Sequence, residues 1–319
     1  MRHKPTLTFN MEVKDIFELR KQGKTEEAYE AIRPMYAVHQ GHYTTIAMFW
    51  CASDMIKLRL EQQLVDEALK IFQALVRLYP NMDDSDGKGH HAILRHALSL
   101  SDASPQFSMV DFLENGGMDS LTADDWKASE ANGHPLPSTA TRLISHVYRE
   151  LEANPTAELG LRCTPILNEA LRHSRNNMNY QRLMALIYKI TGENKKAVDI
   201  YKQLLRKHHQ SYLYSELAAL ASQPSNKIPL LCKAIQTQKE EKFRTKLYIQ
   251  LAELLVDSNP QIAAYLLSES IRIRQAGGFH VSQQQLLLSK KLADIQPATS
   301  AQAIDFIVQQ TELVKKIIG

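Results

Sequence analysis

Long apolar runs are missing from this sequence. The longest extends only from Ile46 to Ala52, whereas a helix that spans a membrane needs about 20 apolar residues. The first residues, Met1 to Met11, include basic side chains, but no apolar stretch follows them, so the sequence predicts no secretory signal. We therefore expect a cytoplasmic protein without a membrane partner.

Cysteine, glycine and proline are also scarce. Cys51, Cys163 and Cys232 are an odd, scattered set without a CxxC pair, which argues against a disulfide framework or a zinc site. Buried reduced thiols are the expected state. Only 12 Gly and 12 Pro interrupt a chain rich in Leu, Ala, Lys, Glu and Gln, so the composition favours helices.

The motifs of common enzymes do not occur. The sequence has no GxSxG elbow, kinase signature or GxGxxG, and the run Asp86 to Gly89 lacks the pattern of a phosphate-binding loop. No nucleophile, base and orienting group can be assembled from motifs. An enzyme is therefore the least favoured function class, and we expect neither a catalytic residue nor a cofactor.

Two patterns resemble metal sites only in part. The acidic loop at residues 83–87 has the start of a calcium loop, but Ile93 stands where the bidentate Glu should fall. His90, His91 and His96 lack the i, i+4 spacing that places two imidazoles on one helical face. We expect a solvated loop and no metal site.

Charge is distributed unevenly along the chain. Residues 1–160 contain 16 Lys and Arg against 23 Asp and Glu, a net charge of −7, whereas residues 161–319 contain 22 against 12, a net charge of +10. A basic half is a candidate for anionic partners. A solvated basic face, or attraction between the two halves, is the alternative.

A repeat appears in the C-terminal half. Residues 179–209 have the order large, small, aromatic, Gly, small, aromatic. The residues in this order are Met184, Ala185, Tyr188, Gly192, Ala197 and Tyr201, and Leu204 falls on the same helical face as the last two. Leu217-Ala218 repeats the Met184-Ala185 pair 33 residues later, and Leu251-Ala252 repeats it after 34 more. The small residues allow the two helices of each pair to approach closely.

Other segments follow the pattern more loosely. In the middle pair, Gln223-Pro224-Ser225 replaces the turn Gly. Pro229 falls where the second helix should start, in the first turn, where proline is tolerated. Near the N-terminus, Ala28 and Ala68 are 40 residues apart, which predicts a longer helix from Tyr43 to about Leu60. Further helices are expected at 91–100, 139–154, 163–174, 282–295 and 300–318.

Between the repeats, the central segment is less regular. Residues 115–138 gather Gly, Pro, Asn and Asp, and they contain Trp126, which is either a contact residue or a hydrophobic plug under the loop. We divide the chain into N-terminal helix pairs (1–100), an irregular insertion (101–160), and C-terminal repeats with capping helices (161–319). No segment alternates over the length of a strand, so we expect no sheet.

These residues resemble the tetratricopeptide-repeat superfamily over about two-thirds of the chain. A narrower resemblance is to the helical region of bacterial TOTE conflict-system proteins, through ELRKQGKTEEAYE, DFLENGGMDSLTADDW, HPLPSTATRLISHVYREL and PLLCKAI…KLYIQLAELL…IRIRQAGGF. The first resemblance implies an all-α, tetratricopeptide-like α-α superhelix. The second implies a role in bacterial defence, although the cold-shock-like module usually joined to that region is not seen.

The resemblance also implies a function and a surface. A helix-pair solenoid binds partners in the groove lined by the first helix of each pair. In the C-terminal repeats this surface comprises Asn179, Arg182, Lys189, Tyr212, Ser215, Lys246, Ile249 and Glu253. We expect a non-catalytic scaffold that binds a protein or peptide there, with the basic members attracting an acidic segment. The alternative is a nucleic-acid-associated protein that uses the basic C-terminal half.

Overall fold

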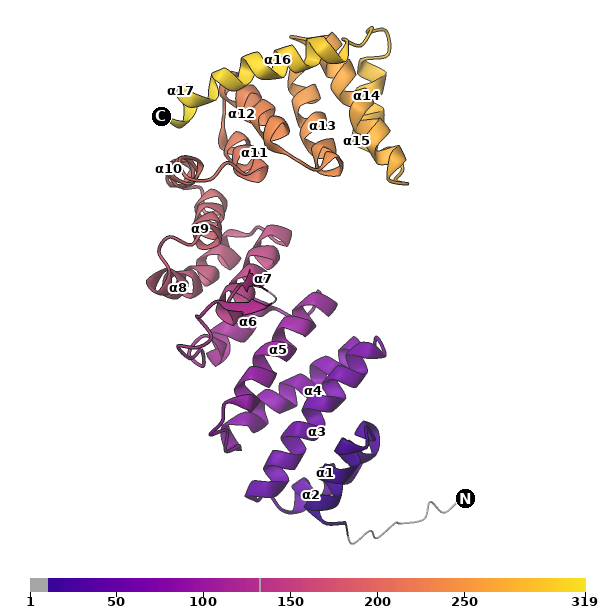
Figure 1. Cartoon of the computed structure of the whole chain (residues 1–319), viewed down its shortest axis with the longest axis vertical. Helices are drawn as coiled ribbons and strands as arrows, with labels where there is room; N and C mark the ends of the chain where they lie inside the picture. The colour runs from indigo at the N-terminus through magenta and orange to yellow at the C-terminus, as the bar shows by residue number, and fades with distance from the viewer. Residues whose placement is uncertain (1–10, 132) are drawn as a thin grey trace. The chain divides into compact units, whose positions relative to one another are not determined.

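Most of the residues that the structure describes lie in α-helices, and almost none lie in strands, as the sequence predicts (Figure 1). The computed structural model describes residues 11–131 and 133–319; residues 1–10, on which the prediction of no secretory signal partly rests, lie outside this range. Contacts group the helices into two compact units. Unit 1 comprises Met1–Asn154 and Asn168–His173, and unit 2 comprises Pro155–Leu167 and Ser174–Gly319. The three-part division expected from the sequence stays a prediction.

Unit 1 contains helix pairs followed by the irregular segment. Its elements are α1 (Val13–Lys21), α2 (Thr25–Val38), α3 (His42–Glu61), α4 (Val65–Leu78), η1 (Tyr79–Asn81), α5 (Lys88–Ala103), α6 (Met109–Phe112), η2 (Leu113–Gly117), β1 (Ser129–Ala131), β2 (His134–Leu136) and α7 (Thr139–Ala153). Helix α3 packs against both α1 and α5, and α5 packs against α7. We call α1, α3, α5 and α7 the first-helix row of unit 1.

The same type of turn connects the first and second helices of a pair in both units. Gly23, Gln63 and Gly192 have φ angles of 73°, 63° and 85°, and each lies five residues before a buried alanine. The next amide donates to the carbonyl five residues back, at 3.0, 2.8 and 2.7 Å respectively. This bond satisfies a carbonyl at the helix end, and the left-handed conformation that it requires favours glycine. Gln63 adopts this left-handed conformation although it is not a glycine.

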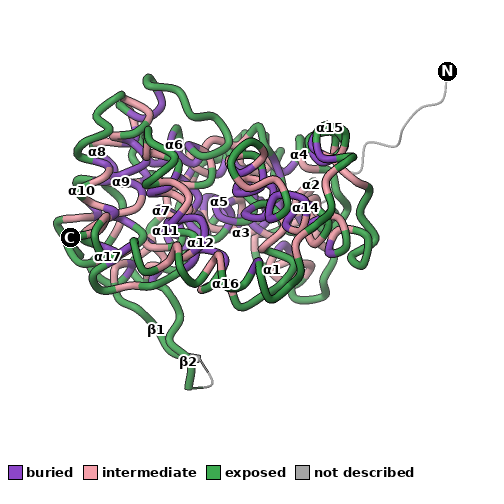
Figure 2. Tube along the Cα trace, turned by 90° about the horizontal axis from the view of Figure 1, so that it is seen from above, coloured by how far each residue is buried: buried purple, intermediate pink, exposed green. Residues whose placement is uncertain are grey.

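The central segment includes a short hairpin that the sequence did not predict. Strands β1 and β2 pair antiparallel, with Ser129 opposite Leu136 and Glu130 opposite Pro135. Each strand has three residues, and this is shorter than any window in which alternation can be recognised. Figure 2 shows the hairpin exposed, away from the buried trace of unit 1. The expectation of no sheet is therefore wrong at this one place in the described chain.

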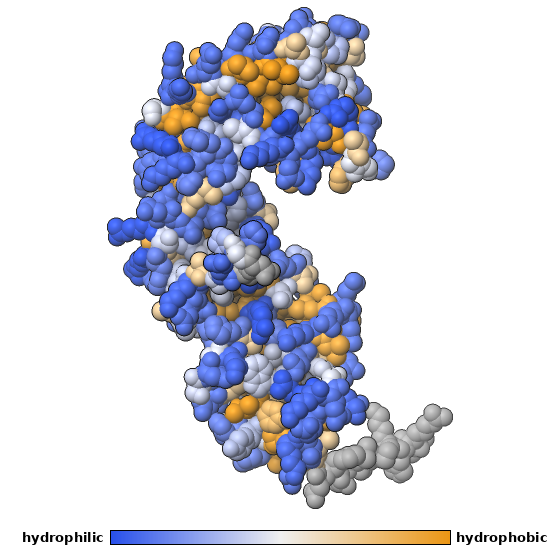
Figure 3. Space-filling model, viewed as in Figure 1, coloured by the Kyte–Doolittle hydropathy of each residue, from blue (hydrophilic) through white to orange (hydrophobic). Residues whose placement is uncertain are grey.

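Unit 2 is a stack of helix pairs with capping helices. Its elements are the first part of α8 (Ala157–His173), α9 (Met178–Ile190), α10 (Asn194–Leu205), α11 (Ser211–Leu220), α12 (Pro224–Thr237), η3 (Glu241–Phe243), α13 (Arg244–Leu255), α14 (Pro260–Ala276), α15 (Gln283–Lys291), α16 (Ser300–Glu312) and α17 (Val314–Ile318). Helix α16 packs across α12 and α14, and α17 packs on α12. The small residues Ala185, Ala218 and Ala252 are all fully buried, as the repeat predicts. Figure 3 shows apolar side chains gathered near the α16 end of this unit.

Several helix boundaries differ from the expected ones. Helix α12 begins at Pro224, so Pro229 lies in its second turn, where it is buried although it lacks the amide that would bond to Ser225. Helix α5 begins at Lys88 because the Asp84 carboxylate accepts hydrogen bonds from two amides of its first turn. The segment expected at 163–174 begins earlier, at 157, and the segment expected at 300–318 divides into α16 and α17.

None of the helices within the described ranges has the length and apolar content that a membrane span requires. The longest, α3, carries Asp54, Lys57 and Arg59 among its 20 residues.

Candidate functional site

The eight residues predicted to bind a partner lie on three first helices of unit 2. Asn179, Arg182 and Lys189 belong to α9, Tyr212 and Ser215 to α11, and the other three, Lys246, Ile249 and Glu253, to α13. The side chains of Asn179, Lys189, Tyr212, Lys246 and Glu253 are exposed. We call these five exposed residues the first-helix surface of unit 2.

Arg182 is engaged within the protein. Its guanidinium forms an ion pair with Glu216 of α11, in which Nε donates to Oε2 at 3.2 Å. The same guanidinium lies over the Tyr212 ring, 4.2 Å from the centroid, and the Tyr212 hydroxyl is 3.6 Å from the Met178 sulfur. The Arg182 and Glu216 side chains are only 16% and 22% exposed, so solvent screens the pair little. Arg182 therefore fastens α9 to α11, a role that its assignment to the partner surface missed.

Unit 1 contains a contact with the same spacing. Arg20 of α1 pairs with Asp54 of α3 at 2.7 Å and lies 5.8 Å from the centroid of the Trp50 ring. In both units the carboxylate is 34 residues after the arginine. The aromatic residue comes four residues before the carboxylate in each case. Neighbouring first helices are thus joined by an arginine, a carboxylate and an aromatic ring in unit 1 as in unit 2.

Ile249 and Glu253 differ in their surroundings. Ile249 is 7% exposed, so its side chain belongs to the core and not to an open surface. Glu253 accepts a hydrogen bond from Gln284 of α15 at 2.7 Å, and both residues line a hollow of about 710 Å³ between α13 and α15. The exposed Leu287 also lines this hollow. The hollow at Glu253 accordingly combines apolar side chains with charges of both signs, since Lys291 lines it as well.

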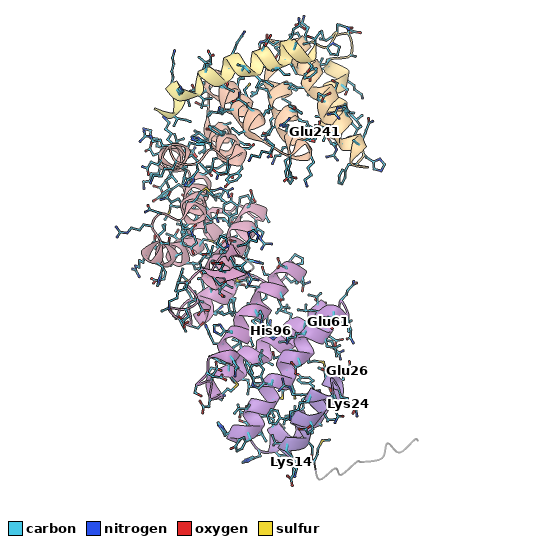
Figure 4. All side chains as sticks on the ribbon, in the orientation of Figure 1. Lys14, Lys24, Glu26, Glu61, His96 and Glu241 are labelled. Carbon is cyan, nitrogen blue, oxygen red and sulfur yellow. The ribbon has the colours of Figure 1, made fainter. Side chains whose placement is uncertain are left out.

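The histidines of α5 have separate roles. His90 Nε2 lies 2.7 Å from Asp125 Oδ2, and His91 Nδ1 lies 3.7 Å from Asp125 Oδ1. His96 (Figure 4) instead bonds Ser53 of α3, with 2.7 Å between Nε2 and Oγ. Burial, together with the charges of Lys57 and Arg95, lowers the pKa of His96 to about 4. His96 is therefore a neutral core residue near pH 7.

Asp125 could not be connected to His90 and His91 from the sequence, because it lies 35 residues away in the irregular segment. The three residues form a group whose ligand-capable atoms lie within 4.8 Å of one another. Asp125 Oδ2 also accepts hydrogen bonds from the amide and hydroxyl of Thr122, at 2.9 and 2.8 Å. Burial acts to raise the Asp125 pKa, but the hydrogen bonds from His90 and Thr122 outweigh it and lower that pKa. The ionised Asp125 carboxylate therefore connects the irregular segment to α5.

Trp126 and the cysteines are packing residues. The Trp126 ring is half-buried and stacks on His173, with 4.0 Å between centroids and an interplanar angle of 5°. This arrangement agrees with a plug under the loop. Cys51, Cys163 and Cys232 are buried and are not in disulfides. Burial raises the pKa of the Cys51 and Cys232 thiols to about 12, so neither is a thiolate near pH 7.

Part of the chain matches a known family model. Residues 178–310 match a family model described as "Domain of unknown function (DUF7017)". The matched span begins at the first residue of α9 and ends within α16, so it contains all eight residues predicted to bind a partner. A search of curated proteins found no match to the chain.

Proposed function

We propose that this protein is a non-catalytic scaffold whose first-helix surface of unit 2 binds an acidic segment of a partner protein. The supporting observation is that three successive first helices present exposed polar side chains on a fixed frame. The Arg182–Glu216 pair and the Tyr212 ring hold α9 and α11 together, and Lys246 of α13 lies 34 residues after Tyr212. A rigid frame reduces the ordering entropy that binding must overcome.

Lys189 and Lys246 provide the attraction for an acidic partner. Both are exposed, and they lie on α9 and α13, on either side of the α11 helix that carries Tyr212. Tyr212, which is 37% exposed, adds an aromatic face between them. Charges of this kind accelerate association and select partners, and salt weakens them. In this proposal the segment lies across the three helices, with its carboxylates near the two lysines.

The experiment compares two double variants of the full chain. Affinity capture from the native cell identifies the partner, and titration of that purified partner measures the affinity. Lys189→Glu with Lys246→Glu should weaken binding at least about tenfold. Lys195→Glu on α10 with Lys239→Glu in the loop after α12 makes the same change in net charge outside the first helices and should leave the affinity unchanged. Equal affinity of the two double variants would refute the proposal that the partner binds at the first-helix surface of unit 2.

Association with nucleic acid is the second candidate, motivated by the net charge of +10 over residues 161–319. Some of the 22 Lys and Arg side chains in this span are engaged in ion pairs and are less available to phosphates. Arg182, Lys196, Lys242 and Arg272 all pair with nearby glutamates. A gel shift with single-stranded and duplex DNA, on the same variants, separates the candidates. Tight binding that is lost in the Lys189 and Lys246 variant would favour nucleic acid.

The resemblance to tetratricopeptide repeats and to the helical region of bacterial TOTE conflict-system proteins gives this proposal a setting. We accordingly propose a cytoplasmic role in a bacterial defence system. Deletion of the gene in its native host, followed by challenge with an invading plasmid or phage, tests that setting. Unchanged resistance would count against it.

A further inference from the structure

Unit 1 has a basic pocket on its first-helix row. The pocket has a volume of about 390 Å³ and lies among α3, α5 and α7. Its lining residues are Trp50, Lys88, His91, Arg95, Leu98, Thr139 and Arg142. Pockets that bind small ligands have volumes of roughly 300–1,000 Å³, so the size suits a small molecule. This pocket is separate from the first-helix surface of unit 2, and the inference does not rest on the function proposed for that surface.

Three side chains with permanent positive charge meet at this pocket. Lys88 and Arg95 lie seven residues apart, on one face of α5, and Arg142 comes from the first turn of α7. Lys88 also pairs with Asp86 at 2.7 Å, but both side chains are more than half exposed, so the pair is weak and exchangeable. Arginine and lysine at one site are the usual means of binding phosphate. The cluster is basic although residues 1–160 together carry a net charge of −7.

The carboxylate nearest to His91 is buried behind it. Asp125 is 1% exposed, and His90 and Thr122 donate hydrogen bonds to its Oδ2. His91 itself is exposed and lies between the Asp125 carboxylate and the pocket that it lines. These hydrogen bonds, and the position of His91, reduce the effect of the Asp125 negative charge on the pocket.

The remaining lining is aromatic and apolar. Trp50 is half-buried, meets Phe49 edge to face with 5.2 Å between centroids, and has the Arg20 guanidinium near its ring. Leu98 is almost fully buried and contributes an apolar wall. Thr139 adds a hydroxyl beside Arg142. The pocket therefore combines positive charge for an anion with a surface for a flat or apolar group.

We propose that this pocket binds a small organic phosphate, with the phosphate held by Lys88, Arg95 and Arg142 and an aromatic ring against Trp50 and Leu98. The size of the pocket and its single tryptophan favour a small ligand over a long polymer. A nucleotide and a simple aryl phosphate share this chemistry, and the probes below distinguish them.

Trp50 provides a direct signal for the test. The chain has two tryptophans, so Trp126→Phe leaves Trp50 as the only indole while an aromatic ring is kept beside His173. AMP, phenyl phosphate, glycerol phosphate and adenosine are titrated against this full-length variant. We expect AMP and phenyl phosphate to change the Trp50 fluorescence to saturation, glycerol phosphate to bind at least about tenfold more weakly because it lacks a ring, and adenosine not to bind.

Charge variants then assign the binding to the pocket. Arg95→Glu with Arg142→Glu should raise the dissociation constant at least about tenfold, whereas Lys70→Glu with Arg77→Glu, on α4, should not change it. If the first pair lowers the helical content, Arg95→Gln with Arg142→Gln replaces it.

Three results would overturn the proposal. The first is the lack of a saturable response to AMP and phenyl phosphate. The second is an equal loss of affinity in the two pairs of variants. The third is a phosphotyrosine peptide or a phosphorylated oligonucleotide that binds at least about tenfold tighter than AMP. The last result would assign the pocket to a macromolecule.

Discussion

Removing the charge of Arg182 measures how strongly the contact between α9 and α11 supports unit 2. Arg182→Met keeps most of the apolar stem and deletes the guanidinium, and Glu216→Gln keeps the shape of the partner without its charge. The two single variants and the double variant form a thermodynamic cycle. The cycle isolates the interaction between the two side chains from the other effects of each change.

The burial of the pair sets the expected magnitude. Both side chains are less than a quarter exposed, and hydrogen bonds to charged groups contribute about 1.5–3 kcal/mol. The Tyr212 ring, with the Arg182 guanidinium 4.2 Å from its centroid, adds about 0.5–1 kcal/mol to the loss in Arg182→Met. We therefore expect Arg182→Met to lower the free energy of unfolding by about 2–4 kcal/mol, with a coupling energy of about 1.5–3 kcal/mol between Arg182 and Glu216.

Urea unfolding followed by far-UV circular dichroism measures these values, provided that the m-value is the same for all variants. The exposed pair of Lys196 and Glu193 is the matched control, and its coupling should stay within about 0.5 kcal/mol. High salt should remove the coupling of the control and leave most of that between Arg182 and Glu216. Equal, small couplings in both pairs would refute the view that Arg182 fastens the first helices.

Three further predictions concern both units. His96 has its pKa lowered by burial, so the folded state loses stability as pH falls from about 6.5 to about 4, by about 3 kcal/mol in total; urea unfolding across this range should show a flatter profile for His96→Gln. Gln63→Gly removes a side chain from a left-handed residue and should raise the free energy of unfolding by about 0.5–1 kcal/mol, and a lower melting temperature would contradict this. Ala185→Leu should destabilise by about 1–3 kcal/mol because it overpacks a fully buried contact, while Ala219→Leu on the exposed face of α11 should not; equal melting curves would mean that the repeat frame is wrong.

The helices of the fold could be predicted because their apolar residues recur with the helical period. Ala185, Ala218 and Ala252 were expected at close helix contacts, and all three are fully buried. The start of α5 could not be predicted, because it depends on Asp84 folding back onto amides five and six residues ahead. The hairpin was missed because its strands are too short to show a period.

The exposure of several residues of the predicted partner surface could be predicted from the sequence. Asn179, Lys189 and Lys246 are exposed, as a surface role requires. The 34-residue spacing of Arg182 and Glu216 was present in the sequence and could have indicated their pairing, since it equals the repeat length. Burial of Ile249 depends on the packing of neighbouring pairs, which spacing alone does not determine.

The basic pocket of unit 1 could not be predicted from the net charge of the N-terminal half of the sequence. Two of its cations come from α5, and the third comes from α7, more than 40 residues later in the sequence. All three lie in a half of the chain that is acidic overall. Only the contact of α5 with α7, and of α3 with α5, brings Arg95, Arg142 and Trp50 to one pocket. Net charge over a long window therefore says little about such a site.

Photo-crosslinking to the captured partner tests the central proposal most directly. A photoreactive amino acid is placed at Asn179 on α9, and in a separate protein at Asp199 on α10; both positions are exposed. The proposal predicts a partner adduct from position 179 that disappears when Lys189 and Lys246 are changed to Glu, and no adduct from position 199. An adduct from position 199 alone would contradict binding at the first-helix surface of unit 2.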